Sequence, residues 1–183
     1  MNPEKRKRVI VGCVLCAAIN SNYKRYFQFI GRDLYCLNTD VIRVFKNMYC
    51  MDYHPQIEEI TNDDVDFYTH TSISAGIKQD LWYIVGISNN IGNPKNVGFY
   101  APHYPLCSPI TPQSTPWEVW TLGCEQQKVE RLKSEHLQNY HYGYAFAPTN
   151  VLYRMEHGVY KGLPQIDEVL GKSISKDEGW CQD

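Results

Sequence analysis

The sequence lacks a hydrophobic run long enough to cross a membrane. A membrane-spanning helix needs about 20 consecutive apolar residues, and the longest apolar run, residues 9–19, is well short of that length. It directly follows a basic cluster at residues 5–8, an order that is also typical of a secretory signal peptide. The run therefore predicts a buried first element, for which we favour a helix over a strand. The alternative is secretion with residues 1–18 as the signal segment.

The sequence also lacks an excess of positive charge. Its formal net charge is -2, and the cluster at residues 5–8 is the only dense group of Lys and Arg. A surface that follows nucleic-acid phosphates needs clustered basic side chains. The composition therefore argues against a nucleic-acid partner, and the lack of a long apolar run argues against a membrane span.

No regular cysteine framework is present. The seven cysteines are odd in number and irregularly spaced, whereas a secreted disulfide framework usually uses an even set. We therefore expect free thiols and a cytoplasmic location. In the secreted alternative, Cys36 and Cys50 on adjacent strands are the first candidate disulfide pair.

Metal-binding and cofactor motifs are missing as well. Cys13 and Cys16 form a C-x-x-C, but no second pair follows at zinc spacing. The acidic residues 63–66 lack the order of a calcium-binding loop. Phosphate-binding glycine loops are also absent. We therefore predict no metal and no cofactor.

Catalytic motifs are equally scarce. Covalent catalysis needs a base beside an activated nucleophile, and no known nucleophile motif occurs in the chain. The weak candidates are His103 with Cys107, which are close in sequence after a predicted strand, and His70. Loop positions of this kind often carry catalytic groups.

Aromatic residues and prolines are what the sequence does have in abundance. There are 14 tyrosines, and three of the four tryptophans lie in residues 80–123. Within that stretch, residues 101–116 form a proline-rich loop that is partly rigid in advance and so favours recognition. We assign Trp82 and Trp120 to the core. The predicted binding surface consists of Tyr100, His103, Tyr104 and Trp117.

The pattern of short apolar segments predicts an α+β fold, mostly an antiparallel sheet or partial barrel. We expect a single globular domain over residues 1–183, frayed at residues 1–8 and 176–183. Residues 124–140 carry apolar side chains at spacings of three and four and predict an amphipathic helix, with a short helix at 165–170. Strands are expected in residues 23–37 on both sides of a turn at 31–33, and at 41–49, 67–73, 81–87, 97–100, 117–122, 142–146 and 151–155.

These features favour a non-catalytic binding or interaction module that uses the aromatic and proline-rich loop. A protein or peptide is the expected partner, and a carbohydrate is the alternative. The competing hypothesis is a small hydrolase or transferase that uses a loop histidine with a cysteine or carboxylate. The two differ in whether a histidine meets such a group in an open cleft.

Overall fold

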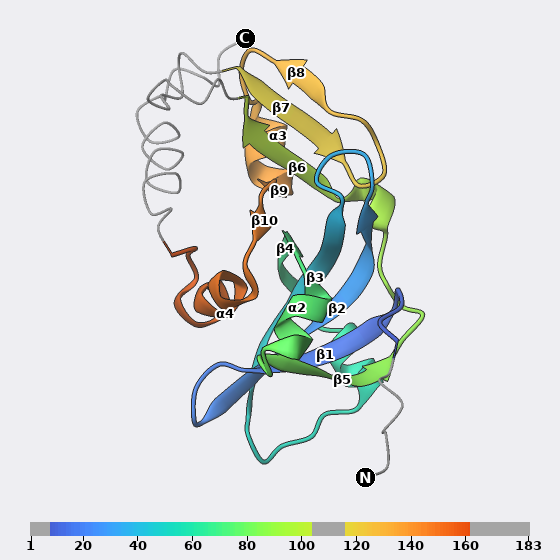
Figure 1. Ribbon diagram of the computed structural model, residues 1–183, viewed down its shortest axis with the longest axis vertical. Coiled ribbons are helices and arrows are strands. Elements are labelled where there is room, and N and C mark those ends of the chain that lie inside the picture. The colour runs from blue at the N-terminus through green and yellow to red at the C-terminus, as the bar shows by residue number, and fades with distance from the viewer. Residues whose placement is uncertain (1–7, 104–115, 162–183) are drawn as a thin grey trace.

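The computed structural model describes residues 8–103 and 116–161, which form two β-sheets with short helices packed on them (Figure 1). The strands are β1 Cys13–Ala18, β2 Tyr23–Asp33, β3 Thr39–Cys50, β4 Val65–Thr71, β5 Trp82–Ile87, β6 Gly98–Pro102, β7 Trp117–Thr121, β8 Gln127–Val129, β9 Tyr140–Tyr142 and β10 Ala145–Phe146. The helices are α1 Ile57–Thr61, α2 Ile73–Lys78, the 3-10 helix η1 Pro94–Asn96, α3 Ser134–Asn139 and α4 Pro148–His157.

The larger sheet has the strand order β10-β4-β3-β2-β1-β5 and is antiparallel except for the β10–β4 pair. Its two faces bury different apolar clusters. Helices α2 and α4 contribute Ile73, Val151 and Met155 to the cluster on one face, and α1 contributes Ile60 to the cluster on the other. A strand covered on both faces in this way tends to carry apolar side chains on both sides.

This double burial explains why the prediction of a helix at residues 9–19 is wrong. In β1, Leu15 and Ala17 belong to one cluster, while Val14 and Cys16 belong to the other. An unbroken apolar run has no period that could distinguish a helix from a doubly buried strand. Residues 13–18 of the run form a strand because they pair with β2 on one side and β5 on the other.

The smaller sheet has the order β8-β7-β6-β9, with β6 and β9 parallel. One of its faces packs against the larger sheet through a shared cluster that includes Ile30, Val41, Phe99 and Trp120. Its other face carries Tyr100, Trp117 and Val119. The shared cluster holds the two sheets together as one packed unit across the described residues.

The helix predicted for residues 124–140 is wrong. The chain there forms strand β8, a loop and only the six residues of α3. Val129, Leu132 and Leu137 nevertheless pack on one cluster, that of Tyr100 and Trp117. The apolar residues have helical spacing because a strand, a loop and a short helix each place one of them on the same apolar cluster.

Residues 151–155 are helical, so the strand predicted there is also wrong. Pro148 opens α4 at a position where its missing N–H costs nothing, and Gly158 closes the helix with a φ of 77°. The buried residues Pro148, Val151 and Met155 are spaced by three and four. A strand would bury alternate residues instead.

The turn predicted at residues 31–33 is wrong because β2 continues to Asp33 and the chain reverses after it. Gly31 lies within the strand, and a Cβ added there would be 3.2 Å from Leu122. Glycine therefore allows close packing between the two sheets at this position, rather than a turn.

The α+β class with a mostly antiparallel arrangement is confirmed. Strands occur as expected near 41–49, 81–87, 97–100 and 117–122, and β4 covers most of 67–73. The helix expected at 165–170 and the fraying expected at 1–7 and 176–183 lie outside the described residues. No helix in residues 8–103 or 116–161 is long and apolar enough to span a bilayer.

Candidate functional site

Three polar side chains meet on one face of the smaller sheet, at the end where β6 leads into the proline-rich loop. His103 Nδ1 lies 2.7 Å from Glu118 Oε1, and Lys128 Nζ lies 3.2 Å from His103 Nε2. Glu118 and Lys128 are direct partners across β7 and β8, which places both on one face. We call this group the rim cluster.

The rim cluster remains in contact with solvent. The His103 side chain is 31% exposed and that of Glu118 is 20% exposed. With Lys128 donating to Nε2, the imidazole suits the tautomer that carries its proton on Nδ1 and donates to Glu118. The cluster is therefore an ordered, charged feature at the surface.

Two of the predicted binding residues do not lie on this surface. Tyr100 is 8% exposed and Trp117 is 4% exposed, and their rings pack edge to face at 6.0 Å between centroids. Successive side chains of a strand point to opposite faces. Tyr100 and Trp117 accordingly lie on the face opposite Phe99 and Trp120. The structure assigns them to a core cluster, whereas Tyr104 and Cys107 lie outside the described residues.

The turn between β2 and β3 lies beside the smaller sheet (Figure 1). It carries two large apolar side chains that are exposed. Leu34 is 67% exposed and Tyr35 is 64% exposed, the highest values for large hydrophobic residues in the described part of the chain. The backbone N–H of Cys36 donates to Asp33 Oδ1 at 3.0 Å, and the Cys36 thiol donates to the Cys124 carbonyl at 3.5 Å. These contacts order the turn, which we call the hairpin tip.

The Cys36 thiol feels the charge of Glu118 in the rim cluster, but it does not have the ionisation state of a nucleophile. Burial, followed by the negative charges of Asp33 and Glu118, raises the pKa of its thiol to about 12. The thiolate is the reactive form of cysteine. Cys36 is therefore held as a thiol, and its hydrogen bond to Cys124 is structural.

The second histidine candidate, His70, is buried in the interior. Its Nε2 lies 2.9 Å from Asp33 Oδ2, and both side chains are 0% exposed. The Trp120 indole N–H donates to the same carboxylate oxygen at 2.9 Å. The contact joins β4, the end of β2 and β7, so it pins the two sheets together. His70 thus meets a carboxylate but has no opening to a substrate.

The described cysteines are free thiols. Neither the C-x-x-C residues nor the pair considered for the secreted alternative come together. Cys13 and Cys16 belong to clusters on opposite faces of the larger sheet, because residues three apart on a strand point to opposite sides. Cys50 is paired with Tyr23 at the far end of the β2–β3 hairpin from Cys36. Cys36 and Cys50 are therefore separated by the length of the hairpin.

The acidic residues after α1 have structural partners. The Asp63 carboxylate accepts hydrogen bonds from the backbone N–H groups of Asn47 and Asp64, each at 2.8 Å. Asp66 forms an ion pair with Arg25 at 2.7 Å. No group of three or more metal-ligating side chains is assembled within the described ranges.

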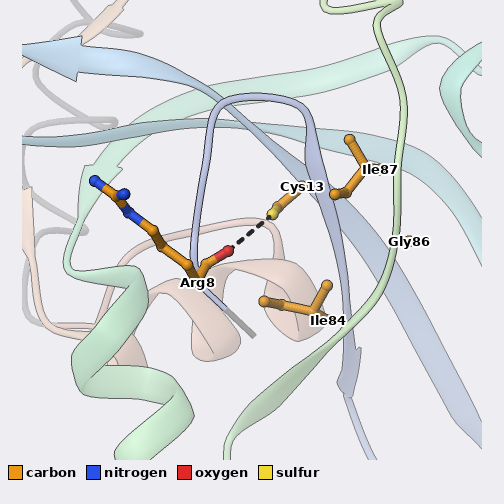
Figure 2. A pocket seen from close by; sticks show the side chains of 5 residues that line it. All are labelled: Arg8, Cys13, Ile84, Gly86 and Ile87. Atoms are coloured by element: carbon orange, nitrogen blue, oxygen red, sulfur yellow. Dashed lines mark hydrogen bonds between the residues drawn. The ribbon is translucent and has the colours of Figure 1, made fainter. Parts of the chain in front are cut away.

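A hollow of about 410 Å³ lies between the start of the described chain and β5, and Figure 2 shows its lining. Ile84, Gly86 and Ile87 make it mostly apolar, and the Cys13 thiol points to the Arg8 carbonyl at 4.0 Å. The Arg8 side chain extends away from the other four residues (Figure 2). Without convergent polar groups, this hollow offers no catalytic chemistry.

Comparison of the chain with protein-family models, with curated proteins and with solved structures gave no match in any of the three. The functional assignment therefore rests on the geometry of the described residues.

Sequence reasoning identified His103 and missed its two partners, Glu118 and Lys128, because cross-strand pairing brings them together. It also missed Leu34 and Tyr35, whose exposure depends on where β2 ends. A signal for the tip was available: two large apolar residues directly follow Gly31, Arg32 and Asp33 within a turn-like stretch.

Proposed function

We propose that this chain is a non-catalytic binding module that contacts a protein or peptide partner through the hairpin tip and the rim cluster. The observation that carries the proposal is the exposure of Leu34 and Tyr35 on an ordered turn. Adjacent apolar groups of this kind, bordered by charge, are typical of contact surfaces. Because the turn is already ordered, a partner would lose less free energy in fixing it.

The rim cluster supports the same assignment, because the charge of its Glu118 acts on Cys36 of the hairpin tip. His103, Glu118 and Lys128 supply one cationic, one anionic and one titratable group on the neighbouring sheet. Polar groups around an apolar centre give an interface its orientation and its specificity. That the proline-rich segment after His103 takes part in recognition stays a prediction from the sequence.

The alternative is a small hydrolase or transferase in which His103, oriented by Glu118, acts as a general base. The 2.7 Å contact between them favours this reading, since a base held by a carboxylate is the arrangement that activates a nucleophile. Cys107 is the candidate nucleophile. If this alternative is right, iodoacetamide should alkylate Cys107 faster than the exposed Cys50, and His103→Ala should abolish the difference.

The binding proposal is tested with the double variant Leu34→Ser, Tyr35→Ser. Proteins retained by the wild-type chain from its natural source would be identified and purified, and their affinity measured by calorimetry. We expect the double variant to weaken binding at least about tenfold, since it removes two interface anchors. Met48→Ser, a change at a residue 57% exposed on β3, is the matched control and should bind like the wild type. Equal affinity of the double variant and the control would refute the proposed surface.

We further propose a cytoplasmic location, with residues 13–18 retained in the folded chain. The support is twofold: the described cysteines are free thiols, and β1 lies between β2 and β5 in the larger sheet. Cleavage after Ala18 would remove this interior strand. We therefore expect a chain lacking residues 1–18 not to fold, as judged by circular dichroism. A cooperatively folded truncated chain would contradict the proposal.

A further inference from the structure

Arg154, on α4, holds its guanidinium over two aromatic rings. Its Cζ lies 4.2 Å from the centroid of the Phe67 ring and 4.4 Å from that of Tyr160. The Tyr160 ring is fixed in turn, because its hydroxyl donates to Thr69 Oγ1 at 2.7 Å and its face stacks on Phe146 at 3.6 Å. The half-buried guanidinium is therefore held by packing in one orientation.

The hydrogen-bond donors of this guanidinium have no protein acceptor in residues 8–103 and 116–161. The buried arginines differ: Arg25 donates to the Phe45 and Met155 carbonyls and to Asp66, and Arg43 donates to Gln28. For Arg154 the interactions are its contacts with the two rings and its charge effect on His141. A guanidinium presents five N–H donors in a planar fork that matches the oxygens of a carboxylate or phosphate.

The positive charge of Arg154 acts on a second basic group, the His141 imidazole. His141, on β9, is half-buried and accepts a long hydrogen bond at Nδ1 from the Tyr68 backbone N–H at 3.5 Å. Burial, and then the positive charge of Arg154, lowers the pKa of His141 to about 4, while Asp66 acts in the opposite direction. Asp66 is the acidic group that acts on His141, and its carboxylate is already paired with Arg25 at 2.7 Å. It is therefore not an uncommitted negative charge for His141.

We propose that Arg154 binds an oxyanion, namely the carboxylate or phosphate group of a small molecule. The guanidinium fork would receive two oxygens of the anion side by side, in the bidentate geometry that is strongest for this pair. Stacking on Phe67 and Tyr160 has already ordered the side chain, so binding would cost little further entropy. The anion would also offset the charge that opposes protonation of His141.

The test follows the Arg154 Nε–H group and the His141 ring by NMR during titration of the full chain at pH 7. Inorganic phosphate and acetate are the two probes, and sodium chloride at equal ionic strength separates specific binding from screening. We expect saturable shifts of both groups with at least one probe, and a rise in the pKa of His141 in its presence. The probe that binds more tightly distinguishes the phosphate class from the carboxylate class.

Variants locate the binding. Arg154→Gln should weaken it at least about tenfold, the value of one or two charge-assisted hydrogen bonds. Arg154→Lys keeps the charge but loses the fork, so it should weaken binding to a lesser degree. Arg32→Gln, at an arginine whose Nη2 donates to the Asn38 carbonyl, is the control and should bind like the wild type. A wild-type chain that shows no saturable shift, or the same shift with chloride, overturns the proposal whether or not the variants fold.

Discussion

Asp33 and His70 form a fully buried contact at 2.9 Å between Oδ2 and Nε2, in the interior that the two sheets share. The same carboxylate accepts from the Trp120 indole and from the backbone N–H of Cys36. One side chain at the end of β2 thus ties together β4, β7 and the hairpin tip. His70 Nδ1 is the one buried side-chain polar atom without a hydrogen-bond partner among the described residues, so the alignment of His70 depends on Asp33.

Replacement of Asp33 should therefore be strongly destabilising. Asp33→Ala leaves its partners unpaired in the interior, and we expect a loss of about 3–5 kcal/mol in the free energy of unfolding. Asp52→Ala, at an exposed carboxylate, should change it by less than about 0.5 kcal/mol. Urea denaturation monitored by circular dichroism gives both values. Similar midpoints for the two variants would show that Asp33 does not hold the sheets together.

The ionisation of Asp33 predicts a loss of stability in acid. Burial alone would raise its pKa, but hydrogen bonds from His70, the Cys36 N–H and Trp120 together lower the pKa below its usual value. The unfolded chain therefore takes up the proton first, and the stabilising contribution is lost as the pH falls below about 4. Urea midpoints measured from pH 5 to pH 2 should fall in the wild type and stay flatter in Asp33→Asn.

His141 predicts a separate loss at higher pH. Its folded-state pKa of about 4 lies below the ordinary value of 6.5, so acid favours the unfolded state, in which the imidazole is readily protonated. The contribution of His141 to the free energy of unfolding is fully present above about pH 6.5 and declines towards pH 4. The decline amounts to up to about 3 kcal/mol, at about 1.4 kcal/mol per pKa unit. His141→Asn should remove this slope, whereas the exposed His54→Asn should retain it. An unchanged slope in His141→Asn would assign the decline to other groups.

The packing of α4 on the larger sheet can be tested with two neighbouring positions. Met155 is 2% exposed and packs in the main cluster, while Glu156 is exposed. Met155→Ala should cost about 2–5 kcal/mol, and Glu156→Ala less than about 0.5 kcal/mol. Thermal and urea unfolding of both variants would show the difference. Equal costs would mean that α4 does not present Met155 to the sheet.

Thiol reactivity should divide the described cysteines into three groups. Cys50 and Cys124 are exposed, Cys13 and Cys16 are buried, and Cys36 is half-buried with its pKa raised to about 12. Iodoacetamide at pH 8 with peptide mapping should therefore label Cys50 and Cys124 first, then Cys36, and the buried pair only after denaturation. Rapid labelling of Cys13 in the native chain would contradict the burial of β1.

Part of the site followed from the sequence, because some residues can be interpreted locally. His103 follows an apolar run and precedes a proline-rich segment, which predicts a surface histidine, and its side chain is partly exposed in the structure. Trp82 and Trp120 are core residues, as expected. The sequence predicts Tyr100 and Trp117 at the surface, but they are buried. Whether a strand residue is buried depends on which face of its sheet is covered, and the sequence does not show this. Large aromatic residues show the same sequence pattern in a small sheet whether they face solvent or a second layer of the structure.

The sequence by itself determined the α+β class and the position of most strands, because β-branched and aromatic runs between turn residues favour extended chain wherever they occur. Tertiary structure decided the rest. Within the run at residues 9–19, residues 13–18 form a strand because β2 and β5 flank them. Residues 124–140 divide among a strand, a loop and a short helix that pack on one cluster. Cross-strand register brought Glu118 and Lys128 to His103, and a shared interior brought Asp33 to His70. Such contacts join residues distant in sequence, so no local pattern specifies them.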